Sequence, residues 1–234
     1  MSVPQRSDYL APLLAALPAD VRRRLDEVGE VAIDDANLAA MRGRTLRSPG
    51  TPTGAVAHTD HHVPGAPGDP DVAVRLHRER DVTLPRPGLI SIHGGGYVIG
   101  SHLGDDGRFD GWCTTLQCVG VSVGYRLAPE TPYPGAYQSN DDDVPAYAVP
   151  ARARDLTGLP PAFVTVGNLD GLLDEDLDYA RRLIAAGVPT DVHVFADGPH
   201  AFDSMLPNTA IAARARRTLE DWLQARMHPE TEAA

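Results

Sequence analysis

Three short motifs hold residue types that can act together on a carbonyl group. The first is the run His93-Gly94-Gly95-Gly96, which follows an apolar stretch. Because glycine has no Cβ, the N–H groups of such a run can turn towards a substrate oxygen and form an oxyanion hole. The run also fits a simple tight turn. A phosphate loop fits poorly, because the G-x-G-x-x-G spacing is missing and the chain contains no lysine.

Asp170 and His200 supply the other two motifs, each directly after an apolar run. The carboxyl ends of parallel strands meet at one edge of a sheet, so the two side chains are expected to lie close together. A carboxylate beside a histidine fixes the imidazole tautomer and prepares the ring as a general base. Two structural alternatives stay open: Asp170 as the N-cap of the next helix, and His200 as a structural histidine.

Two serines are candidate nucleophiles, and neither fits the role well. Ser122 stands in Gly120-Val121-Ser122-Val123-Gly124, which matches G-x-S-x-G. A nucleophile elbow needs a strand, a sharp turn and a helix, whereas Ser122 lies inside an apolar run and is predicted to be a buried strand serine. Ser139 has no glycine support and precedes three acids that disfavour an alkoxide. The nucleophile therefore stays unidentified.

The elements that position these residues alternate between strand and helix patterns. Residues 1–48 are predicted to form a helical N-terminal cap segment, and residues 49–234 an α/β domain. Within that domain, residues 54–63 and 71–80 alternate like an antiparallel hairpin. Four apolar runs without alternation predict strands buried on both faces, starting near residues 88, 118, 161 and 190. Helical patterns at 174–187 and 208–227 complete a mainly parallel sheet flanked by helices.

Composition narrows the classes of partner and cofactor. The formal net charge of −11 argues against nucleic acid or an anionic membrane as the main partner. All 21 basic residues are arginine, which excludes a P-loop lysine and a Schiff-base lysine. No cofactor is expected. Cys113 and Cys118 form neither a C-x-x-C motif nor a disulfide framework, and the first twenty residues resemble neither a signal peptide nor a membrane span, so a cytoplasmic location is expected.

A metal site is not expected either. His58, His61 and His62 in "HTDHH" include two neighbours that strand alternation sends to opposite faces. The pair His61 and His62 therefore cannot easily ligate one ion, and a structural role is expected for these histidines.

Four segments of the sequence resemble one protein family, and the resemblance covers nearly the whole chain. "LISIHGGGYVIGS", "VSVGYRLAPETPYPGA", residues 143–194 and "GPHAF" are similar to the hormone-sensitive-lipase-like α/β-hydrolases. The resemblance implies hydrolysis of small carboxylic esters by a Ser-Asp-His triad. It assigns the oxyanion hole to the N–H groups of Gly94 and Gly95, the orienting carboxylate to Asp170 and the general base to His200.

One part of the family pattern is missing. The serine elbow is expected between the glycine run and Asp170, but only "TPYPGAYQSND" joins the flanking blocks. About 75 residues, or roughly two strand–helix units, are absent between about 137 and 142. The expected fold is thus an incomplete α/β-hydrolase with two half-sheets and unpaired inner edges, which favours low stability or homo-oligomers. Two functions stay open: a carboxylic-ester hydrolase, or a non-catalytic binding protein or inactive remnant of one.

Overall fold

The chain divides into two compact units, which are residues 1–31 with 144–222, and residues 32–143 with 223–234. The computed structural model describes residues 12–29, 32–43, 53–65, 70–83, 85–131 and 153–229. Among these residues, no helix is long and apolar enough to cross a membrane. The boundary near residue 48 between a cap and a main domain stays a prediction.

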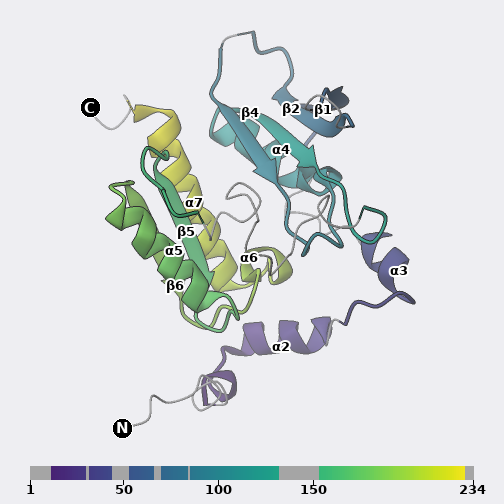
Figure 1. Cartoon of the computed structure of the whole chain (residues 1–234). Coiled ribbons are helices and arrows are strands. Elements are labelled where there is room, and N and C mark those ends of the chain that lie inside the picture. The colour runs from purple at the N-terminus through teal and green to yellow at the C-terminus, as the bar shows by residue number, and fades with distance from the viewer. Residues whose placement is uncertain are drawn as a thin grey trace. The chain divides into compact units, whose positions relative to one another are not determined.

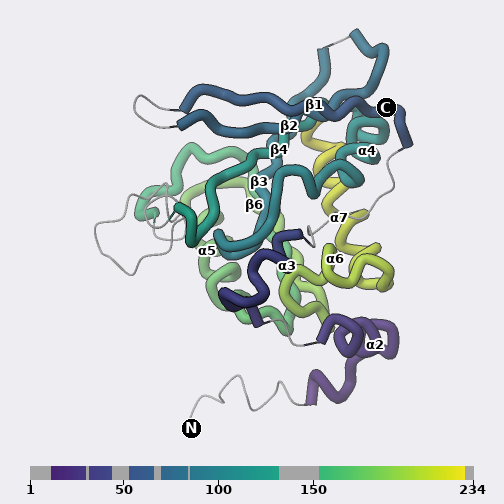
Figure 2. Tube along the Cα trace, turned by 90° about the vertical axis from the view of Figure 1, so that its right-hand side faces the viewer, coloured from purple at the N-terminus to yellow at the C-terminus, as the bar shows by residue number. Residues whose placement is uncertain are grey.

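The unit that contains residue 93 is built on a four-stranded sheet of order β1-β2-β4-β3. Its strands are β1 (Val56–Val63), β2 (Val72–Glu79), β3 (Gly88–Ile92) and β4 (Val119–Gly124). The pairs β1–β2 and β2–β4 are antiparallel, and β3–β4 is parallel. The predicted hairpin is confirmed, and its two strands run side by side in Figure 2.

One face of this sheet is covered by the 3-10 turn η1 (His102–Asp105) and helix α4 (Asp106–Thr115). The ring of Phe109 in α4 stacks on His77 of β2, with centroids 4.3 Å apart. The face of β2 that carries Arg75 and His77 therefore lies under a helix, and His77 is completely buried. The sequence pattern does not reveal α4, because its ten residues include two glycines and no clear apolar stripe. A shorter helix, α3 (Leu38–Gly43), precedes the sheet.

The prediction that β3 is buried on both faces is wrong. Its residues alternate between exposed and half-buried, and Ile90 and Ile92 are each 69% exposed. The reason is its position, because β3 is an edge strand that pairs only with β4 among the described strands. An apolar run shows that a strand can be buried. Burial of both faces also requires other strands or helices that pack against them.

The unit that contains Asp170 is built on a parallel pair, β5 (Ala162–Gly167) and β6 (Thr190–Phe195). Helix α5 (Leu173–Ala185) and helix α7 (Ala210–Met227) flank this pair in Figure 1. The ring of Trp222 in α7 contacts Phe163, and its Nε1 donates to Asp191 Oδ2 at 2.6 Å. Helix α5 packs against the same two strands. The predicted strand–helix–strand–helix order is confirmed here.

Apolar side chains from distant parts of the chain form the core of this unit. Helix α2 (Ala19–Val28) and the short helix α6 (Phe202–Met205) contribute to it together with β6 and α7. The α2 part of the N-terminal helical prediction is therefore confirmed as a helix. The buried members of this cluster are Leu17, Val21, Phe195, Phe202, Leu206, Ile211 and Ala215.

The described strands form two separate sheets rather than one. The absence of a central strand predicts this separation, because the strand expected beside β3 would otherwise join the four-stranded sheet to the β5–β6 pair. The fold class is confirmed as a partial α/β-hydrolase fold, with parallel and antiparallel pairings mixed in the larger sheet.

Candidate functional site

Asp170 and His200 meet at the carboxyl ends of β5 and β6. The Nδ1 atom of His200 lies 3.0 Å from Oδ2 and 3.1 Å from Oδ1 of Asp170. A carboxylate can only accept hydrogen bonds, so Nδ1 carries the hydrogen and Nε2 carries the lone pair. The Asp170 side chain is 8% exposed and that of His200 is 66% exposed. A buried carboxylate thus holds an accessible imidazole in the tautomer that a general base requires.

The turns after the two strands hold this pair in place. Leu169 donates its N–H to the carbonyl of Gly198 at 3.0 Å, and Asp170 donates to the carbonyl of Gly167 at 3.0 Å. A Cβ atom on Gly167 would lie 1.9 Å from the Gly198 carbonyl oxygen, so the close approach of the turns requires glycine there. Asn168 Oδ1 accepts from the N–H of Asp197 at 2.8 Å and joins the turns again.

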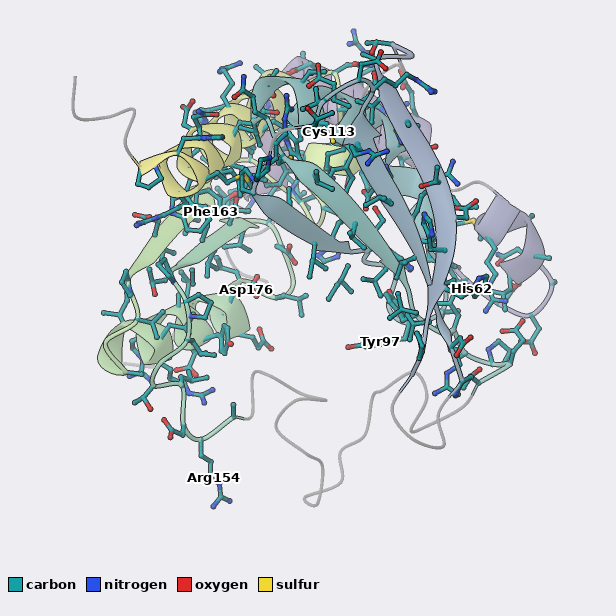
Figure 3. The ribbon with its side chains drawn as sticks, turned by 90° about the horizontal axis from the view of Figure 1, so that it is seen from above. His62, Tyr97, Cys113, Arg154, Phe163 and Asp176 are labelled. Atoms are coloured by element: carbon teal, nitrogen blue, oxygen red, sulfur yellow. The ribbon has the colours of Figure 1, made fainter. Side chains whose placement is uncertain are left out.

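Asp170 does not cap the following helix. The N-cap of α5 is Leu172, and Asp170 Oδ1 instead accepts the N–H of Leu172 at 3.0 Å in a local turn. The carboxylate is therefore oriented by backbone on one side and by His200 on the other. Asp176, in the first turn of α5 (Figure 3), has a raised pKa because it is partly buried and lies near the Asp170 and Glu175 carboxylates.

The glycine run lies in the other unit, directly after β3. Gly95 and Gly96 have φ values of 129° and 58°, and Tyr97 follows with 60°. A Cβ atom on Gly95 would lie 2.0 Å from the carbonyl oxygen of Ile99, so this position requires glycine. Among the hydrogen bonds between described residues, none uses the N–H of Gly94 or Gly95 as donor. These two N–H groups have the freedom that an oxyanion hole needs.

Side chains around the run hold its carbonyls and leave its amides free. The Tyr125 hydroxyl donates to the carbonyl of His93 at 2.8 Å, and the two rings stack with centroids 4.2 Å apart. Burial, with a smaller effect of Tyr97, raises the pKa of Tyr125, so its hydroxyl stays a donor at neutral pH. Arg42 Nε donates to the carbonyl of Val98 at 2.9 Å. Tyr97, which directly follows the glycine run, is labelled in Figure 3.

Ser122 lies in the middle of β4 and is 1% exposed. His77 Nε2 lies 2.9 Å from its Oγ, and the hydroxyl donates to Asp105 Oδ2 at 3.2 Å. The G-x-S-x-G letters therefore describe a strand interior. The strand continues from Ser122 to Gly124, and neither a turn nor a helix begins directly after this serine, so the elbow geometry is missing there.

Other serines do not fill the role in the part of the chain that the structure describes. Ser139, the second candidate, lies outside the described residues. Ser91 donates to Asp105 Oδ2 at 2.7 Å, and Ser101 accepts from the N–H of Leu103 at 3.1 Å. Ser204 donates to the carbonyl of Ala201 at 3.1 Å. Within these residues, no serine hydroxyl hydrogen bonds to His200.

Three residues with metal-ligating atoms lie close together under the four-stranded sheet. The sequence did not reveal this group. His58, His77 and Asp106 each bring one such atom within 4.8 Å of the others. The pairing of β1 with β2 and the position of α4 bring His77 and Asp106 to His58. The spacing of the three residues along the sequence does not indicate that they lie close together.

Known proteins resemble this chain in both sequence and fold. A family model described as alpha/beta hydrolase fold matches it in two pieces, residues 89–142 and 136–204. The pieces meet where the missing segment is predicted. Esterase LipI of Mycobacterium tuberculosis is 47% identical over 49 residues, which cover 21% of this chain and 15% of the relative. Carboxylesterase NlhH of the same organism is 31% identical over 141 residues, which cover 60% and 43%.

The solved structures give the same picture. Bacterial Heroin Esterase superimposes with a TM-score of 0.81 and 22% sequence identity, covering 92% of this chain and 99% of that one. At this identity the likeness shows the fold. This chain spans less than half the length of the two mycobacterial relatives named above. By sequence match and by fold, the chain belongs to the hormone-sensitive-lipase-like family of α/β-hydrolases.

Proposed function

We propose that this chain binds small carboxylic esters and hydrolyses them slowly through His200, without a serine acyl-enzyme. The observation that carries the proposal is the Asp170–His200 pair, with its 3.0 Å hydrogen bond and its exposed imidazole. The esterases among the relatives support the substrate class. The proposed compartment is the cytoplasm, supported by two cysteines that are free thiols.

In the proposed reaction, His200 Nε2 accepts a proton from a water molecule as the water oxygen attacks the ester carbonyl carbon. The Asp170 carboxylate stabilises the imidazolium that forms. The tetrahedral intermediate then expels the alcohol, which takes the proton back from Nε2. A carboxylic acid and an alcohol are released.

The rate should be low because the nucleophile is missing. Serine hydrolases that lose a triad member retain roughly 10³–10⁴-fold acceleration over water, from the oxyanion hole and binding. The measurement is hydrolysis of a short-chain nitrophenyl ester by wild type, His200→Gln and His62→Gln. His62 is an exposed histidine on β1 and serves as the matched control. We expect hydrolysis above buffer for wild type and His62→Gln, and the buffer rate for His200→Gln.

The second candidate is a non-catalytic binding protein. It is favoured by the burial of Ser122, which removes a serine that could otherwise form an acyl-enzyme. Buffer-rate hydrolysis by the wild type, with ester binding detected by calorimetry, identifies this second function. Equal hydrolysis by wild type and His200→Gln contradicts the first.

A further inference from the structure

Two histidines and an aspartate converge under the four-stranded sheet. His58 and His77 are directly paired across the hairpin, and Asp106 begins α4. The two Nδ1 atoms are 2.8 Å apart, and Asp106 Oδ1 lies 3.7 Å from that of His58 and 3.8 Å from that of His77. These three distances place one point about 2 Å from all three atoms, which is the length of a zinc bond to imidazole nitrogen or carboxylate oxygen.

The hydrogen bonds of His77 direct its Nδ1 lone pair to this point. Ser122 donates its hydroxyl hydrogen to Asp105 Oδ2, so its oxygen accepts from His77 Nε2, 2.9 Å away. Nε2 therefore carries the ring hydrogen. In a neutral imidazole the other nitrogen, Nδ1, is then an acceptor or a metal ligand.

His58 is arranged in the same way. Its Nε2 lies 3.6 Å from Oδ1 of Asp110, a carboxylate that is 2% exposed. Neither atom has a hydrogen-bond partner among the described residues. With its hydrogen on Nε2, His58 directs that hydrogen towards the carboxylate and leaves the Nδ1 lone pair for a metal. His77 thus has a hydrogen-bond acceptor behind Nε2, as ligating histidines usually do, and His58 has a carboxylate on that side.

Asp106 keeps one oxygen available. Arg75 Nη2 donates to its Oδ2 at 3.1 Å. Arg75 Nε is 2.8 Å from Oδ1, but its N–H does not point at that oxygen, and both atoms lack a hydrogen bond within the described residues. Oδ1 is thus in an ion pair with Arg75 and keeps a lone pair that can bind a metal beside the two Nδ1 atoms.

The charges around the cluster favour a dication. With both imidazoles neutral, three carboxylates lie around the cluster against one guanidinium group, which is a net charge of −2. These groups are Asp60, Asp106 and Asp110, with Arg75. A bound Zn²⁺ balances this excess.

We propose that His58, His77 and Asp106 form a zinc site, with the two Nδ1 atoms and Asp106 Oδ1 as ligands and water in the fourth position. Two imidazoles and one carboxylate are a donor set that suits Zn²⁺. The metal links β1, β2 and α4, so its binding contributes to the stability of this unit. The site is independent of the proposed ester hydrolysis.

A hydrogen bond between the two rings is the competing arrangement, because the two Nδ1 atoms are 2.8 Å apart and a His58 ring with its hydrogen on Nδ1 would donate it to His77. That arrangement turns the His58 Nε2 lone pair towards Asp110 Oδ1 and adds no positive charge beside Asp106.

The test uses the full chain without a polyhistidine tag, stripped with a chelator and desalted. Zn²⁺ is titrated against a chromogenic chelator, and Co²⁺ binding is followed by visible absorption. We expect one equivalent of Zn²⁺ at micromolar concentration and a higher melting temperature with Zn²⁺ than without it. The Co²⁺ spectrum should lack the thiolate charge-transfer band that Cys113 or Cys118 would produce.

Two ligand variants and one control complete the test. His58→Gln and Asp106→Asn should lower Zn²⁺ affinity at least about 100-fold, whereas His62→Gln should leave it unchanged. The proposal is overturned if the wild type binds no Zn²⁺ at these concentrations, if both ligand variants bind as the wild type does, or if a thiolate band appears. Circular dichroism reports whether each variant folds, and where one does not, the wild-type Co²⁺ spectrum decides.

Discussion

The Asp170–His200 pair combines a buried carboxylate with an exposed imidazole. Asp170 is held by the Leu172 amide and by His200, so its position does not depend on solvent. Both residues directly follow apolar runs that predict strands, and from that position their proximity could be predicted. The distance between them and the tautomer of His200 could not be predicted, because both depend on how the turn after β5 contacts the turn after β6. The catalytic roles of the pair stay a proposal.

The stability contributed by Asp176 is expected to depend on pH. Its raised pKa means that the folded state disfavours the charged carboxylate, which lies partly buried near Asp170. The native state then binds more protons than the unfolded state between the ordinary and the raised pKa. Stability from this group therefore falls as pH rises through that window and stays low at neutral pH.

Asp176→Asn should thus raise the free energy of unfolding at pH 7, by about 0.5 kcal/mol, because it removes an unfavourable charge. The gain should shrink towards pH 3.5, where Asp176 is protonated in both states. Urea unfolding at both pH values measures it, with Asp178→Asn in the same helix as a matched control. A gain that is equal at both pH values, or a loss at pH 7, contradicts this account.

At the scale of elements, the glycine run follows β3, a strand whose neighbours the sequence could not reveal. The apolar run correctly predicted a strand, and the hairpin and the β5–α5–β6 order were also predictable from periodicity. The exposure of β3 could not be predicted from periodicity, because burial depends on a neighbouring strand that is not present among the described residues. Helix α4 was missed because its interior glycines give no helical pattern, although it covers His77.

The backbone of the glycine run predicts a contrast between two adjacent substitutions. Gly95→Ala places a Cβ 2.0 Å from the Ile99 carbonyl oxygen at a φ of 129°, so it should destabilise the unit by about 2 kcal/mol or more. A Cβ on Gly94 meets no atom within 4 Å, and Gly94→Ala should change stability by less than about 0.5 kcal/mol. Denaturant unfolding compares them. Equal effects would show that the loop does not have this backbone.

At the scale of the whole molecule, two sheets occur where the family pattern predicts one continuous sheet. The edge strand β3 exposes Ile90 and Ile92, each 69% accessible. Exposed strand edges with apolar side chains are sites of association between chains. We therefore predict that the protein self-associates as its concentration rises.

Sedimentation velocity across a range of concentrations tests this prediction. The double variant Ile90→Thr/Ile92→Thr should shift the distribution towards the monomer, because it removes apolar surface at the free edge. Val63→Thr, at the end of β1 with a side chain that is also exposed, is the matched control and should leave the distribution unchanged. A wild-type chain that stays monomeric at every concentration contradicts the prediction.

The central claim is that this chain keeps the base and the oxyanion loop of an ester hydrolase without its nucleophile. Treatment with a fluorophosphonate probe, followed by intact mass measurement, tests it most directly, with a serine esterase of the same family as the positive control. We predict no stoichiometric adduct, because Ser122 is buried and hydrogen-bonded to Asp105 and His77. A stoichiometric adduct mapped to Ser122 or Ser139 would contradict the claim.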